Sequence, residues 1–222
     1  MKRHVLWCIG LLLLAFARSA EAQACLGLSS FADTPVRLTG ARLFPVDGTD
    51  ADAVALGAGR SHGIFLSLGY ARVRHGAADV FPDDDPTEQQ TLFELGYQIP
   101  LGGGRVQLCP VGGAGLGKGP VINNTDYRRR FASAGLAIGI PLNLGFGIRL
   151  APNASARWEY LRTTAEGLVD AGSSGVADVG LGLIIARRLV VQPTYSMPFA
   201  TGTSEDPRLG VVVSIGSGWR PR

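Results

Sequence analysis

The 222-residue sequence is poor in charge and in the side chains that most often carry catalysis, with 18% charged residues, three histidines and three cysteines. Beyond Ala24, no helical period of 3.6 residues persists. No later apolar run reaches the roughly 20 residues that a membrane-spanning helix requires. These absences exclude a protein that crosses a membrane with helices. The 31 glycines, in contrast, are unusual for a secreted soluble protein.

The first 22 residues have the layout of a secretory signal peptide. A basic start at Lys2 and Arg3 precedes an apolar run from Val5 to Ala17, and small residues follow. We expect a mature chain that begins at Gln23, with cleavage after residue 24 as the alternative. An uncleaved anchor is disfavoured because the apolar run is short for a bilayer.

The whole sequence has 21 basic and 18 acidic residues, and loss of this segment removes three basic residues and one acidic residue. The mature chain keeps 18 basic and 17 acidic residues. The mature chain is therefore nearly neutral. Its charge gives no support for a nucleic-acid partner.

The stretch from Thr91 to Leu101, TLFELGYQIPL, alternates between apolar side chains and polar or small ones, as a β-strand does. The apolar face begins with Phe93 and Leu95, and the other face carries Glu94 and Gln98. Similar alternation predicts ten strands, at roughly Val36–Phe44, Ala53–Arg60, Ile64–Arg74, Thr91–Leu101, Arg105–Gly117, Arg128–Pro141, Gly145–Leu161, Val176–Ala186, Leu189–Pro198 and Arg208–Ser217.

The connections between these strands alternate in length along the chain. Short turns are expected at Ser61–Gly63, Gly102–Gly104, Leu142–Leu144 and Arg187–Arg188. Long polar loops are expected at Pro45–Asp52, His75–Gln90, Lys118–Tyr127, Thr163–Gly175 and Phe199–Pro207. This order predicts an all-β, up-and-down antiparallel barrel with turns at one end and loops at the other.

The less apolar face of these strands decides what surrounds the barrel. It holds mostly glycine, alanine and serine, with isolated Glu94, Gln98, Arg149, Arg157, Gln192 and Thr194. A lipocalin-like barrel or a β-sandwich would turn this face to water, where it would do little for solubility. We therefore expect the apolar rows to face lipid and the polar residues to face a narrow lumen.

With a signal peptide, alternating strands and a valine-rich last strand near Trp219, the chain resembles the small outer-membrane β-barrel proteins of double-membraned bacteria. The resemblance implies a transmembrane barrel of about ten strands, with eight as the alternative, over residues 36–219. It implies a periplasmic segment at 23–35 and a tail at 220–222. Members usually end on an aromatic residue, so the tail after Trp219 departs from the pattern.

The same resemblance implies a location in the bacterial outer membrane, with outer-membrane lipid, lipopolysaccharide and the barrel-assembly machinery as partners. We expect a structural, surface-interaction or limited small-solute passage role, and we predict no enzymatic activity and no cofactor. The alternatives are an outer-membrane lipid A-modifying enzyme or protease, and a secreted lipocalin-like ligand-binding barrel.

Cys25 and Cys109 remain after loss of the signal segment, and strand order places both at the turn end of the barrel. Because exported proteins meet an oxidising compartment, we predict a disulfide between them. A lipidated Cys25 is the rival interpretation, and two unpaired thiols are the third.

The inward face predicts a polar network in the lumen formed by Glu94, Gln98, Arg149 and Arg157. Glu159 joins it if the strand stays regular past Pro152. At the loop end, the run Arg128, Arg129 and Arg130 predicts a basic rim for lipopolysaccharide phosphates, since guanidinium groups fit phosphate oxygens.

The remaining candidates for chemistry lie in the expected loop at residues 75–90. His75 is followed by Asp79 and the run 83–85, but no EF-hand spacing is present, and we predict a solvated acidic loop and no metal site. Catalysis would require His75, since His62 falls in an expected turn at the other end. No family catalytic motif surrounds His75, and we predict no catalytic residues.

Overall fold

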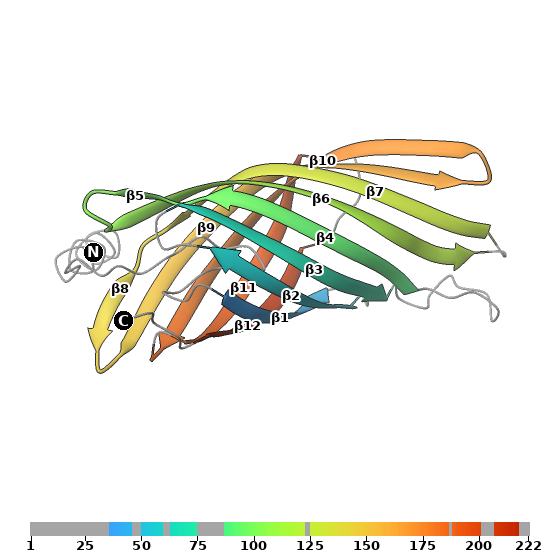
Figure 1. Cartoon of the computed structure of the whole chain (residues 1–222). Helices are drawn as coiled ribbons and strands as arrows, with labels where there is room; N and C mark the ends of the chain where they lie inside the picture. Colours follow the sequence, from blue (N-terminus) through green and yellow to red (C-terminus); the bar gives the residue numbers. More distant parts are fainter. Residues whose placement is uncertain are drawn as a thin grey trace, which may run out of the picture.

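The computed structural model describes residues 36–45, 50–59, 63–74, 87–122, 125–186, 188–200 and 207–217. These residues form β-strands joined by turns (Figure 1), and they include no helix long and apolar enough to cross a membrane. The strands are β1 (Val36–Pro45), β2 (Asp50–Gly59), β3 (Ile64–Arg74), β4 (Thr87–Tyr97), β5 (Ile99–Leu101), β6 (Val106–Ile122), β7 (Thr125–Gly139), β8 (Leu142–Gly145), β9 (Ile148–Ala165), β10 (Leu168–Ile185), β11 (Leu189–Ala200) and β12 (Arg208–Gly216).

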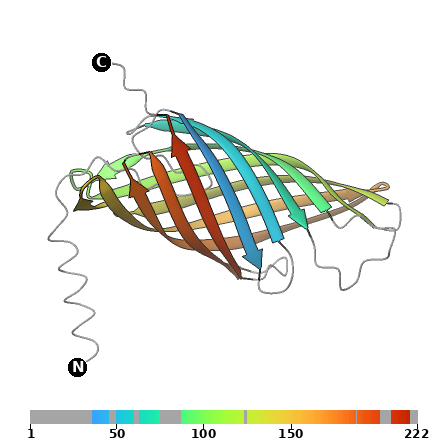
Figure 2. The same cartoon turned by 90° about the horizontal axis from the view of Figure 1, so that it is seen from below.

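The strands close into a single antiparallel barrel whose wall has ten strand positions (Figures 1 and 2). We call each position a stave, because β4 with β5 and β7 with β8 each occupy one position. Each stave pairs with the next along the chain, and β12 pairs with β1 to complete the ring. The short β5 follows β4 along the same neighbour, β6, and the short β8 follows β7 beside β9. The predicted up-and-down barrel of about ten strands is confirmed, and the alternative of eight strands is wrong.

The side chains of the wall alternate as the sequence predicts. In β4, Phe93, Leu95 and Tyr97 point outward and are about half exposed, whereas Gly96, and Gln98 just after the strand, are buried in the interior. The outer face is apolar along most of its height, and the inner face is small or polar. A soluble ligand-binding barrel would show the reverse distribution. A closed ring also pairs the backbone groups along the wall, as hydrocarbon requires.

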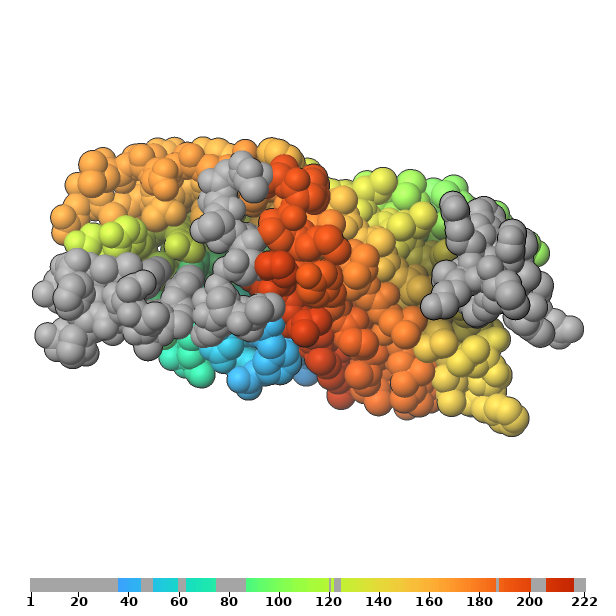
Figure 3. All heavy atoms as spheres, turned by 180° about the vertical axis from the view of Figure 1, so that it is seen from behind, coloured from blue at the N-terminus to red at the C-terminus, as the bar shows by residue number. Residues whose placement is uncertain are grey.

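The loop end of the barrel differs from the expected pattern. The segments Lys118–Tyr127 and Thr163–Gly175, expected to be long loops, lie almost entirely within paired strands. The strands β9 and β10 are joined only by a tight turn at Glu166 and Gly167, both with positive φ. Figure 3 shows this hairpin, in orange, extending well past the end of β12, in red. Threonine and valine favour strands, and this propensity outweighs the polar composition that suggested loops.

One turn at the opposite end is also displaced from its predicted place. Residues 142–144 belong to β8, and the chain reverses at Phe146 and Gly147. Gly145, Phe146 and Gly147 all have positive φ, which glycine adopts without steric strain. The side chain of Asn143 accepts a hydrogen bond of 3.0 Å from the backbone N–H of Gly145 and supports the turn. The flanking glycines therefore decide where the chain turns.

Several sequence predictions fall outside the described residues. These are the signal segment at 1–22 or 1–24, the periplasmic segment at 23–35 with Cys25, the residues His62, His75, Asp79 and 83–85, and the chain end with Trp219 and 220–222.

Candidate functional site: the polar lumen and its two ends

The turn end of the lumen is packed with buried side chains. Arg37, Gln98 and Gln107 are each 1% exposed, and Arg149 is 7% exposed. Nε2 of Gln98 donates a hydrogen bond of 3.2 Å to Oε1 of Gln107, on the neighbouring strand β6. Buried polar groups of this kind are stable only when they are hydrogen-bonded. This layer therefore acts as a polar floor across the barrel.

An aromatic ring completes the floor. Phe65 of β3 is buried and packs with Cys109 and Ala137 from β6 and β7. Its ring lies against Gly96, where an added Cβ would come within 2.2 Å of the ring. Glycine at position 96 is therefore required by this packing. The combination of ring and amide side chains fills the lumen at this level.

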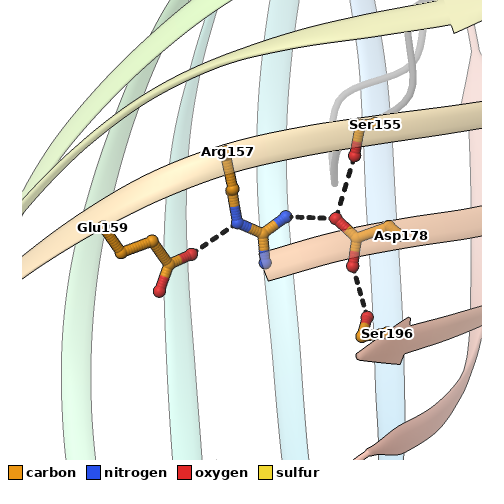
Figure 4. A network of polar contacts seen from close by, with 5 residues as sticks. All are labelled: Ser155, Arg157, Glu159, Asp178 and Ser196. Atoms are coloured by element: carbon orange, nitrogen blue, oxygen red, sulfur yellow. Dashed lines mark hydrogen bonds and ion pairs between the residues drawn. The ribbon is translucent and has the colours of Figure 1, made fainter. Parts of the chain in front are cut away.

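Midway along the barrel, a charged network spans three neighbouring strands (Figure 4). Asp178 of β10 lies directly opposite Ser155 of β9 and Ser196 of β11, and its carboxylate accepts hydrogen bonds from both hydroxyls. The guanidinium of Arg157 donates to Asp178 at 2.6 Å and also to Glu159. Arg157 thus bridges two carboxylates, and hydrogen bonds between charged partners of this kind are stronger than neutral ones.

Glu159 faces the lumen because β9 passes Pro152 without a change of register. Pairing of β9 with β10 is continuous from Ala165 to Ile148, so Arg157 and Glu159 share the inner face. Across the lumen, Glu94 accepts a hydrogen bond of 3.1 Å from Ser67 and acts electrostatically on Arg157. The guanidinium of Arg157 therefore lies between the carboxylates of Asp178 and Glu159, with Glu94 on the same inner face of the barrel.

The predicted basic rim divides between the two faces of β7. Arg128 and Arg130 are exposed on the outer face, whereas Arg129 points inward and forms an ion pair with the buried Glu88. Glu88 also accepts a hydrogen bond from Gln90. Because successive side chains of a strand alternate in direction, three consecutive arginines cannot share one face. The prediction of one continuous rim of all three arginines is therefore wrong.

Cys109 lies on the inner face of β6 near the turn end and is 1% exposed. It is disulfide-bonded in the structure, and its partner lies outside the described residues. Pairing with Cys25 stays a prediction.

All four residues of the predicted lumen network face the interior, but they occupy two separate layers. Gln98 and Arg149 belong to the floor, whereas Glu94 and Arg157 lie at mid-height. Sequence reasoning missed Asp178, the acceptor at the centre of the network. The available signal was the single carboxylate of the predicted strand Val176–Ala186, which lies on the face opposite Val179 and Leu181.

The described residues contain no group of three or more histidine, cysteine, aspartate or glutamate side chains arranged to hold a metal ion. All three histidines lie outside the described part of the chain. What the described lumen offers chemically is hydrogen bonding and charge neutralisation between wall strands.

No protein-family model and no curated protein matches the chain. Solved structures with a similar fold include the N-terminal β-barrel domain of Pseudomonas aeruginosa OprF (12% identity, TM-score 0.35, 81% of this chain and 95% of that chain). They also include the β domain of the Bordetella autotransporter BrkA (11% identity, TM-score 0.47, 82% and 98%). A third is the KdgM porin in complex with disordered oligogalacturonate (10% identity, TM-score 0.39, 82% and 99%). Likeness at these values carries no argument about function.

The chain's own architecture defines its class. A closed antiparallel barrel with an apolar outer face and a polar, largely filled interior is the architecture of a bacterial outer-membrane β-barrel protein. The protein is an outer-membrane barrel with ten staves.

Proposed function

We propose that the protein is a non-enzymatic outer-membrane barrel that acts at the cell surface and does not conduct solutes. The observation that carries this proposal is the floor at the turn end, where Arg37, Gln98 and Gln107 are each 1% exposed. With about ten strands, a barrel of this size has an interior that side chains can fill. The charged network at mid-height adds a second obstruction.

The outer end supports a role in surface contact. A transmembrane strand needs about 9–11 residues, whereas β6, β9 and β10 have 17, 18 and 18. The excess residues extend past the hydrocarbon and carry exposed apolar side chains at the tip, with Leu168 78% exposed and Val169 55% exposed. Such a rigid hairpin is suited to contact with lipid headgroups or another molecule outside the membrane.

The proposal has consequences for processing and partners. The segment at 1–22 directs export and is removed, the residues at 23–35 lie in the periplasm, and the assembly machinery inserts residues 36–219. Lipopolysaccharide surrounds the loop end, and Arg128 and Arg130, exposed on the outer face, support contact with its phosphates. The buried Cys109, near the periplasmic end, supports a covalent link to Cys25.

Planar-bilayer recordings test the closed lumen. The mature protein is expected to give no steady single-channel conductance. A variant with a reduced floor (Phe65→Ala, Gln98→Ala and Gln107→Ala) is expected to conduct, because it removes a buried ring and a buried amide pair from the lumen. Leu168→Ala, on the exposed hairpin, serves as the control for substitution alone. Steady conductance of the unaltered protein would overturn the proposal.

A separate assay addresses enzymatic activity. Vesicles that contain the protein and lipid A, or the protein and an unstructured peptide, are expected to show no cleavage. Turnover that is lost in His75→Ala would contradict the non-enzymatic assignment and support the lipid A-modifying enzyme or protease.

A further inference from the structure

The outer face of β6, β7 and β9 carries a group of cations near the loop end. Cross-strand register places Arg130 directly opposite Arg162, and Arg128 directly opposite Lys118. All four side chains are exposed on the outside of the barrel. The sequence separates Lys118, Arg130 and Arg162 widely, so only the pairing of the strands brings them together.

Three of the four cations have no carboxylate partner among the described residues. Lys118 pairs with Asp126 at 3.3 Å, but no ion pair among the described residues involves Arg128, Arg130 or Arg162. Like charges directly opposite each other on neighbouring strands destabilise a sheet. An anion that binds between Arg130 and Arg162 would remove this repulsion.

A second basic group on the same outer face provides a contrast. Arg42 lies 3.2 Å from Asp50 and 3.8 Å from Asp52, and Arg74 lies 4.0 Å from Asp50. Those arginines already have carboxylate partners. They therefore form a matched control, with the same residue type and the same end of the barrel but with their charge neutralised.

The level of the Arg130–Arg162 pair is set by its neighbours on β9. Trp158 and Tyr160 share the outer face with Arg162 and are about half exposed. Aromatic girdles of outer-membrane barrels lie at the boundary between hydrocarbon and headgroups. Arg162 lies two residues beyond Tyr160 toward the loop end, at the level where lipid headgroup phosphates begin.

We propose that Arg130 and Arg162 bind a phosphate group of an outer-leaflet glycolipid, with Arg128 and Lys118 as further contacts. Directly opposed residues have Cβ atoms about 4.5–5.5 Å apart, so two guanidinium forks can approach one phosphate. The proposal rests on the membrane placement in the proposed function. The conductance test above addresses the lumen and is independent of this site.

Native mass spectrometry of the full mature protein in detergent tests the site, with hexa-acylated lipid A as the probe. Unaltered protein is expected to retain lipid A but not its dephosphorylated form. Arg130→Gln with Arg162→Gln is expected to weaken binding at least about tenfold, the effect of losing charge-assisted hydrogen bonds. Arg42→Gln with Arg74→Gln is expected to bind lipid A like the unaltered protein.

Three outcomes would overturn the proposal. The first is equal lipid A binding by the Arg130/Arg162 double variant, checked for barrel closure by heat-modifiable gel mobility. The second is equal binding of dephosphorylated lipid A, which would mean that the acyl chains alone are recognised. The third is displacement of lipid A by inorganic phosphate at equal concentration, which would assign the site to free phosphate. Arg130→Lys with Arg162→Lys is expected to lose part of the affinity, since lysine keeps the charge without the fork.

Discussion

The two ends of this barrel are built differently from the same alternating strands. At the turn end, Gln98, Gln107 and Phe65 are buried inside the lumen. At mid-height and toward the loop end, the inner side chains of Arg157 and Glu159 are 35% and 29% exposed. The strands β6, β7, β9 and β10 also continue outward beyond the others (Figure 1). One end is closed by buried side chains, and the other is extended, with partly exposed inner side chains at mid-height.

The difference shows which features the membrane fixes and which it leaves free. Strands β1, β2, β3 and β12 have 9–11 residues, about the length that hydrocarbon requires. The longer strands also span the hydrocarbon, and they stay paired beyond it, where water could have hydrogen-bonded to their backbone groups. Extension beyond the membrane is therefore a property of these strand sequences.

The largest effect that we expect concerns the closed end. If Cys25 and Cys109 are joined, reduction or the double variant Cys25→Ser with Cys109→Ser should lower the free energy of unfolding by about 4–5 kcal/mol, the chain-entropy value for a loop of this length. Urea unfolding of the protein in vesicles, with and without reductant, measures this loss. Reductant should have no effect on the double variant.

Mass analysis after alkylation provides the control for that experiment. Without reductant, the mature protein should take up no alkyl groups on these two cysteines. Two alkylated cysteines would contradict the disulfide, and an added mass of acyl-chain size on Cys25 would support the lipidated form instead.

The next effect compares the membrane-spanning wall with the protruding hairpin. Leu68 lies in the middle of β3 and is 58% exposed, and Leu168 lies at the tip of β10 and is 78% exposed. Leu68→Arg should lower the free energy of unfolding by about 2–4 kcal/mol, because it places a charge in hydrocarbon. Leu168→Arg should leave folding in vesicles nearly unchanged, because its surroundings are aqueous.

Folding yield and urea midpoints of both variants check this contrast. Equal losses would mean that the tip lies in lipid and that the two ends do not differ in the way described. Leu68→Ala controls for loss of packing without charge.

Much of this organisation could be predicted from sequence. Alternation identified all ten staves and the inward direction of Glu94 and Arg157. A period of two is a local property of the chain, so it needs no knowledge of the neighbouring strands. The same rule, applied to the run from Arg128 to Arg130, would have placed Arg129 inside.

The remaining features depend on register, which composition does not determine. Asp178 bonds Ser155 and Ser196 because three strands align at one level. The extended hairpin at Glu166 and Gly167 depends on continued pairing of polar strands, which their composition suggested would be loops. Register is set by turn geometry and by packing across the whole ring.

The smallest effect that we expect concerns the partly exposed network at mid-height. Arg157→Met should lower the free energy of unfolding by about 1–3 kcal/mol, because it leaves the carboxylates of Asp178 and Glu159 without their shared cation. Asp178→Asn should have a smaller effect. Arg157 then keeps Glu159, and the asparagine can still hydrogen-bond with Ser155 and Ser196. Urea unfolding in vesicles provides the measurement.

A double-mutant cycle decides whether this network contributes to stability through its charges. If Arg157 and Asp178 stabilise each other, the double variant should lose less free energy of unfolding than the two single variants together. The reason is that the double variant leaves neither charge without its partner. Added salt should then reduce the coupling only slightly, because the pair lies within the barrel wall and is screened less than surface charges. A coupling of zero would mean that water separates the two groups. In that case the lumen would be wet down to its floor, and the loop end would differ from the turn end more than the structure indicates.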